Sequence, residues 1–234
     1  MHIKFVVGGY YLVQGTQRLH WMDPSHVPSP FWSASSHICE VMPDAWILGW
    51  REDPQADKYR HLLGMDDAAF RRLQAEFNSL FQRGQYGFPN VFFSPEIARA
   101  FHSRYLTHLP QFKLLSIALE QAFSDALVEE DTPPDGIGES GIRHMLRAGT
   151  TPAGLGEFRG FEVLGYDGSG FCSFACNSLE SDYHEKLGVV FNQNGLIDDY
   201  EVAKQAAEYT MLPEVGAEPH LWHPWLVTEL PLAQ

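Results

Sequence analysis

The chain has 234 residues, of which 44% are hydrophobic and 20% charged, so it can bury a sizeable core and is neither disordered nor fibrous. It carries 16 lysines and arginines against 30 aspartates and glutamates, a formal net charge of −14. This charge argues against a sequence-independent nucleic-acid binder, which needs a basic face, and disfavours binding to anionic membranes.

The first 50 residues predict β-structure. Gly8-Gly9 is typical of a hairpin turn between two short strands, 3–7 and 10–13. The stretch 21–37, rich in proline and serine, indicates a loop. The sequence WILGW at 46–50 predicts a short buried strand.

Helices are predicted in the middle of the chain. Apolar residues share one face over 66–82, and Asp66 or Asp67 is suited to cap the start of that helix. A second helix begins at Ser94-Pro95-Glu96, with serine as the cap and proline at the first helical position. The segment 112–127 fits a buried strand in its early part, but we expect a helix from about Ser116.

Residues 129–141 (EEDTPPDGIGESG) are acidic and rich in proline and glycine, and we interpret them as a long loop or linker. Their last six residues match G-x-G-x-x-G. A dinucleotide site requires an apolar strand directly before this motif, whereas here two prolines and several acids precede it. We therefore expect a flexible loop and no nucleotide cofactor.

The C-terminal part predicts two strands, two helices and a final strand. Asp167-Gly168 is a strong hairpin signal, and Asp198 or Asp199 is suited to cap the second helix. We expect the last strand to lie at a sheet edge, because Pro224 cannot donate to a central ladder. The predicted segments are strands 161–166 and 171–174, a helix over 178–187, a helix ending near 211, and strand 220–227 (HLWHPWLV).

The order of these elements predicts an α+β fold. Strands cluster at the N-terminus and again at 160–175, helices lie between and after them, and no regular βαβ alternation is present. We expect one compact domain over 1–234 with a mostly antiparallel sheet, packed helices and the acidic loop near 129–141. The alternative is two subdomains, 1–128 and 142–234.

No motif of a known enzyme chemistry is present: the sequence has no G-x-S-x-G, H-E-x-x-H or P-loop. We therefore expect no catalytic residue and no enzyme. Cys172, Cys176, His220 and His223 are the right residue types for a zinc site, but their spacing matches no familiar zinc motif. Buried free thiols and no metal are the simpler interpretation.

The compartment is predicted from three features. The apolar run at the N-terminus is short and broken by glycines, which is not typical of a signal peptide. No stretch is long enough to be a membrane helix. Three cysteines are too few, and odd in number, for a secreted disulfide framework. We therefore expect a cytoplasmic protein.

The whole excess of negative charge lies in the second half of the chain. Residues 1–117 hold 11 basic and 10 acidic side chains, whereas residues 118–234 hold 5 basic and 20 acidic ones. We interpret this excess as one acidic face, which favours a basic protein partner. Trp222 and Trp225 are candidate aromatic anchors of such an interface. The candidate acidic contacts are Glu129, Glu130 and Asp131, then Glu180, Asp182 and Glu185, and finally Asp198, Asp199 and Glu201.

The acids at 198–201 also have a structural interpretation, because carboxylates near a helix start interact well with the helix dipole. We prefer that interpretation to a metal-binding or acid–base pair, for which paired carboxylates would equally be suited.

Four stretches, all after residue 90, carry a family resemblance. They are 92–105 (FFSPEIARAFHSRY), 112–119 (FKLLSIAL), 160–177 (GFEVLGYDGSGFCSFACN) and 195–209 (GLIDDYEVAKQAAEY). Together they resemble a group of small bacterial proteins that includes immunity proteins of polymorphic toxin and contact-dependent inhibition systems. The most specific piece is GFEVLGYD followed by C-x-x-x-C-N. The resemblance implies no catalytic residue.

The resemblance and the charge predict the same mechanism. Many toxin domains act on nucleic acids and are basic around the active site, and an acidic inhibitor can occupy that site by mimicking the substrate. Our first hypothesis is an immunity protein that binds and blocks a cognate, basic toxin domain, and that binds neither nucleic acid nor membrane. The alternative is a small hydrolase or transferase with a carboxylate or Cys-His site. A third hypothesis is a structural or scaffolding module.

Overall fold

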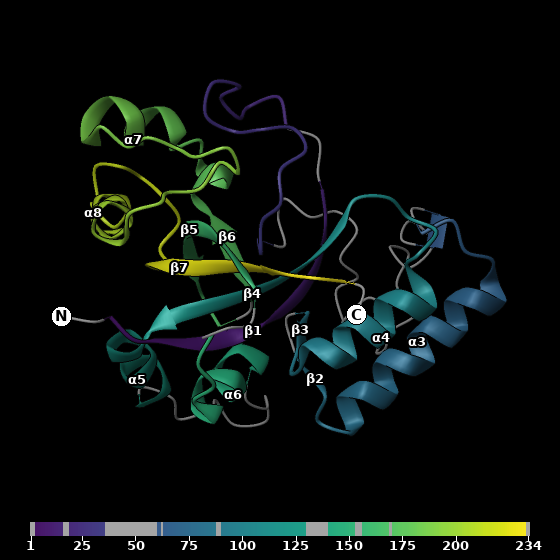
Figure 1. Cartoon of the computed structure of the whole chain (residues 1–234). Helices are drawn as coiled ribbons and strands as arrows, with labels where there is room; N and C mark the ends of the chain where they lie inside the picture. The colour runs from purple at the N-terminus through teal and green to yellow at the C-terminus, as the bar shows by residue number, and fades with distance from the viewer. Residues whose placement is uncertain are drawn as a thin grey trace.

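The computed structural model describes residues 3–15, 19–35, 60–61, 63–87, 90–129, 140–152, 156–168 and 170–232. Their centre is a seven-stranded sheet, ordered β2-β3-β1-β4-β7-β5-β6, in which every pairing is antiparallel (Figure 1). The strands are β1 (Phe5–Gln14), β2 (Tyr86–Gly87), β3 (Val91–Phe92), β4 (Phe112–Glu120), β5 (Glu157–Tyr166), β6 (Phe171–Ser173) and β7 (Leu221–Leu230).

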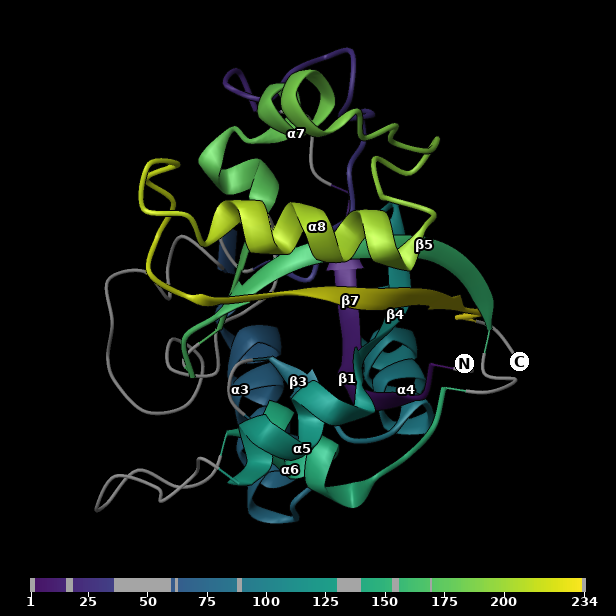
Figure 2. The ribbon, with the colours of Figure 1, turned by 90° about the vertical axis from the view of Figure 1, so that its left-hand side faces the viewer.

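Helices cover both sides of this sheet, which confirms the predicted α+β fold. In Figure 2, α7 and α8 lie on one side of β5 and β7, and α3, α4, α5 and α6 lie on the opposite side. The two apolar cores follow this division, one around Trp225 and one around Trp222. The helices are α3 (Asp67–Gln82), α4 (Pro95–Tyr105), α5 (Gln121–Glu129), α6 (Gly141–Ala148), α7 (Glu180–Leu187) and α8 (Tyr200–Thr210), with a short 3₁₀ helix η1 (Phe174–Asn177).

The helix starts predicted from capping residues are confirmed. Asp66 accepts the backbone amide of Ala69 at 2.7 Å, and α3 begins directly after it. Ser94 caps α4, and Asp199 caps α8. Each cap satisfies an amide that the first turn leaves without a partner, so these boundaries are local properties of the chain. The β5–β6 hairpin and helix α7 are confirmed as well.

The predicted hairpin at Gly8-Gly9 is wrong, because both glycines lie inside the single strand β1. The pairing of β1 with β4 shifts between Val7 and Gly9, which makes Gly8 the extra residue of a bulge. A Cβ on Gly8 would lie 2.7 Å from the ring of Trp225. The glycines therefore serve close packing within the strand and not a turn.

The predicted helix from Ser116 is also wrong in its first part. Residues up to Glu120 belong to β4, and helix α5 begins only at Gln121. Strand β4 pairs with β1 on one side and with β7 on the other, and Leu114 to Leu119 are all buried. A strand buried on both faces is a continuous apolar run, so its sequence has no alternation that would separate it from a helix.

The last strand is central and not at an edge, which corrects the prediction from Pro224. Strand β7 lies between β4 and β5. Its pairing with β4 covers Leu226 to Leu230, whereas Pro224 pairs only with Val163 of β5. The proline is tolerated because it precedes the part of β7 that has two neighbours.

The sheet joins the two halves of the chain. Strands β1 and β4 precede the acidic segment and β5, β6 and β7 follow it, so residues on both sides build one sheet. Helix α6, which the sequence did not predict, begins at Gly141 with Ser140 as its cap. The segment 130–139, the predicted strand 46–50 and Cys39 lie outside the described residues. Within the described part, no helix is long and apolar enough to cross a membrane.

Candidate functional site

Helices α7 and α8 lie side by side on the outside of the sheet (Figure 2). They are joined by a hydrogen bond between the hydroxyls of Tyr183 and Thr210. A second link runs from Lys186 to the hydroxyl of Tyr209 at 2.9 Å. Tyr209 in turn donates to Asp182 at 2.7 Å. These bonds hold α7 against the C-terminal end of α8, so the predicted acidic segments 180–185 and 198–201, which are separate in the sequence, belong to neighbouring elements on the same side of the sheet.

This surface is strongly acidic. Residues 181–217 hold seven carboxylates and two lysines. One of the two lysines, Lys186, forms an ion pair with Asp182 at 2.8 Å. This pair and the hydrogen bond from Tyr209 keep the pKa of Asp182 below its usual range. All the other acids of the segment are exposed. We call the following set the α7–α8 acidic face: Asp182, Glu185, Asp198, Asp199, Glu201, Glu208 and Glu214.

Two members of this face also have structural roles. Asp199 caps α8 by accepting the amide of Val202 at 3.0 Å, and Asp198 accepts the side-chain amide of Asn192 at 2.6 Å. The buried side of α8 faces the core and carries Ala203, Ala206 and Ala207. Glu201 and Glu208 therefore lie on the outer side of the helix, two turns apart.

The remaining acidic candidates do not join this face. Glu180 is 1% exposed, so it is no surface contact, and burial raises its pKa to about 7. Glu129 is exposed at the end of α5, on the opposite side of the sheet. Glu130 and Asp131 lie outside the described residues.

The tryptophan anchors predicted from the sequence are wrong. Trp222 is 1% exposed and Trp225 is 0% exposed, because alternate residues of β7 enter the two apolar cores. The exposed apolar side chains near α7 and α8 are not these tryptophans but Val190, Met211 and Leu212. No pattern in the sequence indicates their exposure. Val190 follows α7 and is 77% exposed; Met211 and Leu212 end α8 and are 47% and 42% exposed.

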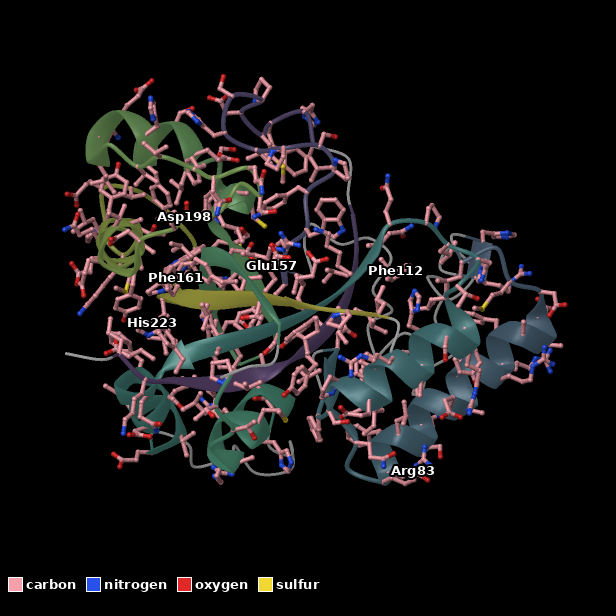
Figure 3. The ribbon with its side chains drawn as sticks, in the orientation of Figure 1. Arg83, Phe112, Glu157, Phe161, Asp198 and His223 are labelled. Carbon is pink, nitrogen blue, oxygen red and sulfur yellow. The ribbon has the colours of Figure 1, made fainter. Side chains whose placement is uncertain are left out.

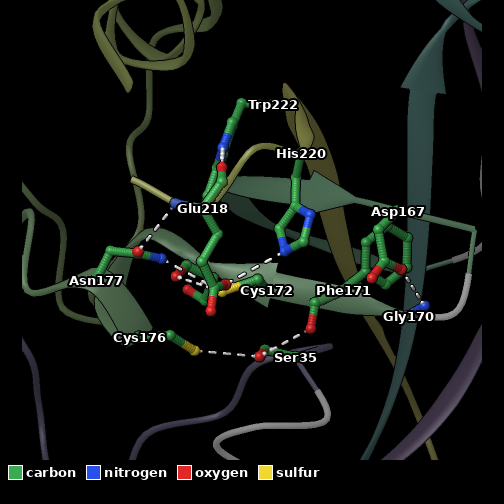
Figure 4. A network of polar contacts seen from close by, with 11 residues as sticks. Ser35, Asp167, Gly170, Phe171, Cys172, Cys176, Asn177, Glu218, His220 and Trp222 are labelled. Carbon is green, nitrogen blue, oxygen red and sulfur yellow. Dashed lines mark hydrogen bonds and ion pairs between the residues drawn. The ribbon is translucent and has the colours of Figure 1, made fainter. Parts of the chain in front are cut away.

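A second cluster of reactive side chains lies where β6, η1 and the approach to β7 meet (Figure 4). Cys172, Glu218 and His220 each offer one ligand atom, and these three atoms lie within 4.8 Å of one another. Nε2 of His220 is 3.2 Å from Oε2 of Glu218. The side-chain amide of Asn177 donates to Sγ of Cys172 at 3.3 Å. We call these four residues the Cys172 cluster.

The structure assembles only part of the zinc set considered from the sequence. Cys176 lies next to Cys172, and its Sγ is 3.3 Å from the hydroxyl of Ser35. His223 points to the other face of β7, where its ring centroid is 4.3 Å from that of Phe123. Burial lowers the pKa of His223 to about 4. Glu218 was missed, because a single acid two residues before a histidine is not a recognisable signal.

The same region contains a buried acid. Glu162 of β5 is 1% exposed, accepts a hydrogen bond from the hydroxyl of Ser33, and is 3.4 Å from the amide of Ala34. Burial raises its pKa to about 7, although these hydrogen bonds oppose the shift. The sequence gave no reason to expect a buried acid, since its partners come from a loop 128 residues away.

The protonation state of Cys172 disfavours nucleophilic catalysis by the Cys172 cluster. Contact with Cys176 and burial raise the pKa of Cys172 well above its usual value, so the free side chain is a thiol. A buried thiol is a poor nucleophile, because the thiolate is the reactive form. The alternative hypothesis of a Cys-His hydrolase therefore gains no support from this geometry.

No family model, no curated protein and no solved structure matches this chain.

Proposed function

We propose that this protein is a cytoplasmic immunity protein that binds a cognate bacterial toxin domain of basic surface and blocks it, without chemistry of its own. The observation that carries the proposal is the α7–α8 acidic face, on which acids from two separate segments of the chain gather. The sequence resemblance given above agrees with it.

The charge supplies a physical reason for the partner's sign. Seven carboxylates against two lysines over residues 181–217 produce a negative potential on this side of the sheet, which attracts a basic protein from a distance. Such complementary charge speeds association and disfavours acidic competitors. It also matches a toxin whose active site binds nucleic acid, because that site is built to receive phosphates.

Charge alone does not make a stable complex, and the face also offers apolar contacts. Met211 and Leu212 are adjacent in the chain at the end of α8, and Val190 lies beyond the end of α7. Interfaces take most of their affinity from a few desolvated side chains surrounded by polar ones. We assign the anchoring role to Met211 and Leu212, in place of the two buried tryptophans.

The direct test is co-expression with the product of the gene next to its own. The proposal expects that the two proteins co-purify, and that cells producing the neighbour survive only when this protein is present. Survival without it, or a failure of the two to associate in pure form, would contradict an immunity function.

The surface is tested by charge reversal on α8. Glu201→Lys combined with Glu208→Lys should slow association with the toxin by about tenfold at low salt and reduce the salt dependence of the rate. These side chains are exposed, so folding should be unaffected. Asp125→Lys, on the exposed side of α5 across the sheet, is the matched control. Equal rates for the two variants would exclude α8 from the interface.

A further inference from the structure

We propose that the Cys172 cluster is a binding site for a divalent transition-metal ion of the zinc type, with Cys172, Glu218 and His220 as its ligands. This inference is independent of the proposed immunity function, because the cluster lies on β6 and the segment before β7 and not on the α7–α8 acidic face.

The distances suit a small tetrahedral site. Ligands at the usual bond lengths of such an ion, about 2.0–2.3 Å, lie about 3.3–3.8 Å from one another. The distance of 3.2 Å between Nε2 of His220 and Oε2 of Glu218 is already close to this range. All three ligand atoms lie within 4.8 Å. Because Glu218 is exposed, its side chain has room to rotate towards the other two ligand atoms.

The residue types fit the charge and the softness of the ion. A thiolate from Cys172 and the carboxylate of Glu218 together balance the two positive charges, and His220 adds a neutral nitrogen. A sulfur and a nitrogen ligand favour zinc, cobalt or nickel over magnesium or calcium, which prefer oxygen. Binding would displace the thiol proton of Cys172, since only the thiolate is a good ligand.

A second layer of contacts holds two of the ligands in place (Figure 4). Asn177 donates to Sγ of Cys172 at 3.3 Å and accepts the backbone amide of Glu218 at 3.4 Å, so it connects the two segments. The indole of Trp222 donates to the backbone carbonyl of Glu218 at 2.9 Å. Such outer partners orient ligands, and their removal commonly weakens metal affinity. Asn177 is therefore assigned as a positioning residue.

Cys176 is not one of the ligands in this assignment. Its thiol is adjacent to Cys172 but lies next to Ser35, and it does not belong to the group whose atoms approach one another within 4.8 Å. The fourth position around the ion is left to water. Cys176 consequently provides a matched control, a neighbouring cysteine in η1 that metal binding does not need.

The test uses the full-length protein, stripped of metal by a chelator, kept reduced by a phosphine, and titrated with Co²⁺. The proposal expects saturable binding of one ion per chain, with an absorption band from thiolate-to-cobalt charge transfer that Zn²⁺ abolishes by competition. Cys172→Ser should remove the band. Glu218→Gln and His220→Asn should weaken binding by at least about tenfold, and Asn177→Ala by about 10–100-fold.

The controls separate a specific site from loss of folding. Cys176→Ser and His144→Asn, the latter an exposed histidine on α6, should keep both the band and the affinity. Glu218→Gln changes an exposed side chain, so it remains informative if Cys172→Ser does not fold, and circular dichroism checks each variant. Absence of a charge-transfer band in the folded parent protein would overturn the assignment. So would binding that Glu218→Gln leaves unchanged, or that Cys176→Ser destroys.

Discussion

Replacing Glu162 by glutamine should change how the stability of this protein depends on pH. In the folded protein the carboxyl group is buried between β5 and the loop that contains Ser33 and Ala34. Burial raises its pKa from an ordinary value of 4.5 to about 7. Glutamine has the same shape, and its amide can donate to the hydroxyl of Ser33 while its oxygen accepts from Ala34.

The sign follows from which state binds the proton more tightly. Between pH 4.5 and about 7 the unfolded chain loses this proton while the folded protein keeps it. Ionisation therefore favours unfolding, and the stability falls as the pH rises through this range. One pKa unit corresponds to about 1.4 kcal/mol, so the contribution of Glu162 falls by about 3 kcal/mol in total.

The assay is urea unfolding of the parent protein and Glu162→Gln from pH 4.5 to 8 at constant ionic strength. The free energy of unfolding of the parent minus that of the variant should decrease by about 3 kcal/mol over this range. His223 acts in the opposite direction. Because its pKa is lowered in the folded protein, the unfolded chain binds the proton more tightly, and the stability falls as the pH falls from 6.5 towards 4. Because both proteins contain His223, its contribution cancels in the difference.

Glu157→Gln is the matched control, since Glu157 lies on the same strand with its side chain 70% exposed. It removes one negative charge from β5 without removing a buried acid. A difference for Glu162→Gln that follows the difference for Glu157→Gln across the whole pH range would refute the reasoning. The stability of the folded state would then not depend on a buried proton at Glu162.

Three further predictions concern packing and capping. Gly8→Ala should lower the free energy of unfolding by about 1–3 kcal/mol, because a Cβ would lie 2.7 Å from the ring of Trp225. Its cost should be much smaller in a Trp225→Ala background, and purely additive losses in this double-mutant cycle would disprove the clash. Trp225→Ala alone should cost about 3–5 kcal/mol in urea unfolding, since the side chain is 0% exposed; a loss under about 1 kcal/mol would contradict its place in the core. Asp66→Ala should cost about 1 kcal/mol in thermal unfolding because its side chain caps α3, and Asp67→Ala should cost less. A larger loss for Asp67→Ala than for Asp66→Ala would contradict Asp66 as the cap of α3.

The candidate sites were predictable only in part. The acids of 180–185 and 198–201 were identified from the sequence because charge is visible there directly; the first stretch lies within a predicted helix and the second at the start of another. Their meeting on one face depends on the packing of α7 against α8. The proposed ligands of the Cys172 cluster are one strand residue and two residues 46 and 48 positions later, a separation over which no local rule connects residue types.

The sequence by itself determined the local features of this protein. Helix starts at Asp66, Ser94 and Asp199 and the hairpin at Asp167-Gly168 follow from side chains that bond to nearby amides or from backbone freedom at a turn, so a short stretch of chain is enough to specify them. The α+β class follows from the order of such segments along the chain.

Only the tertiary structure decided the features that depend on distant neighbours. The apolar run at 116–120 is a strand because β1 and β7 flank it, and β7 is central although it contains Pro224. The tryptophans of β7 are core residues because both faces of the strand are covered. In each case the free energy comes from burial against segments far away in the chain, and composition or periodicity contains no information about which segments those are.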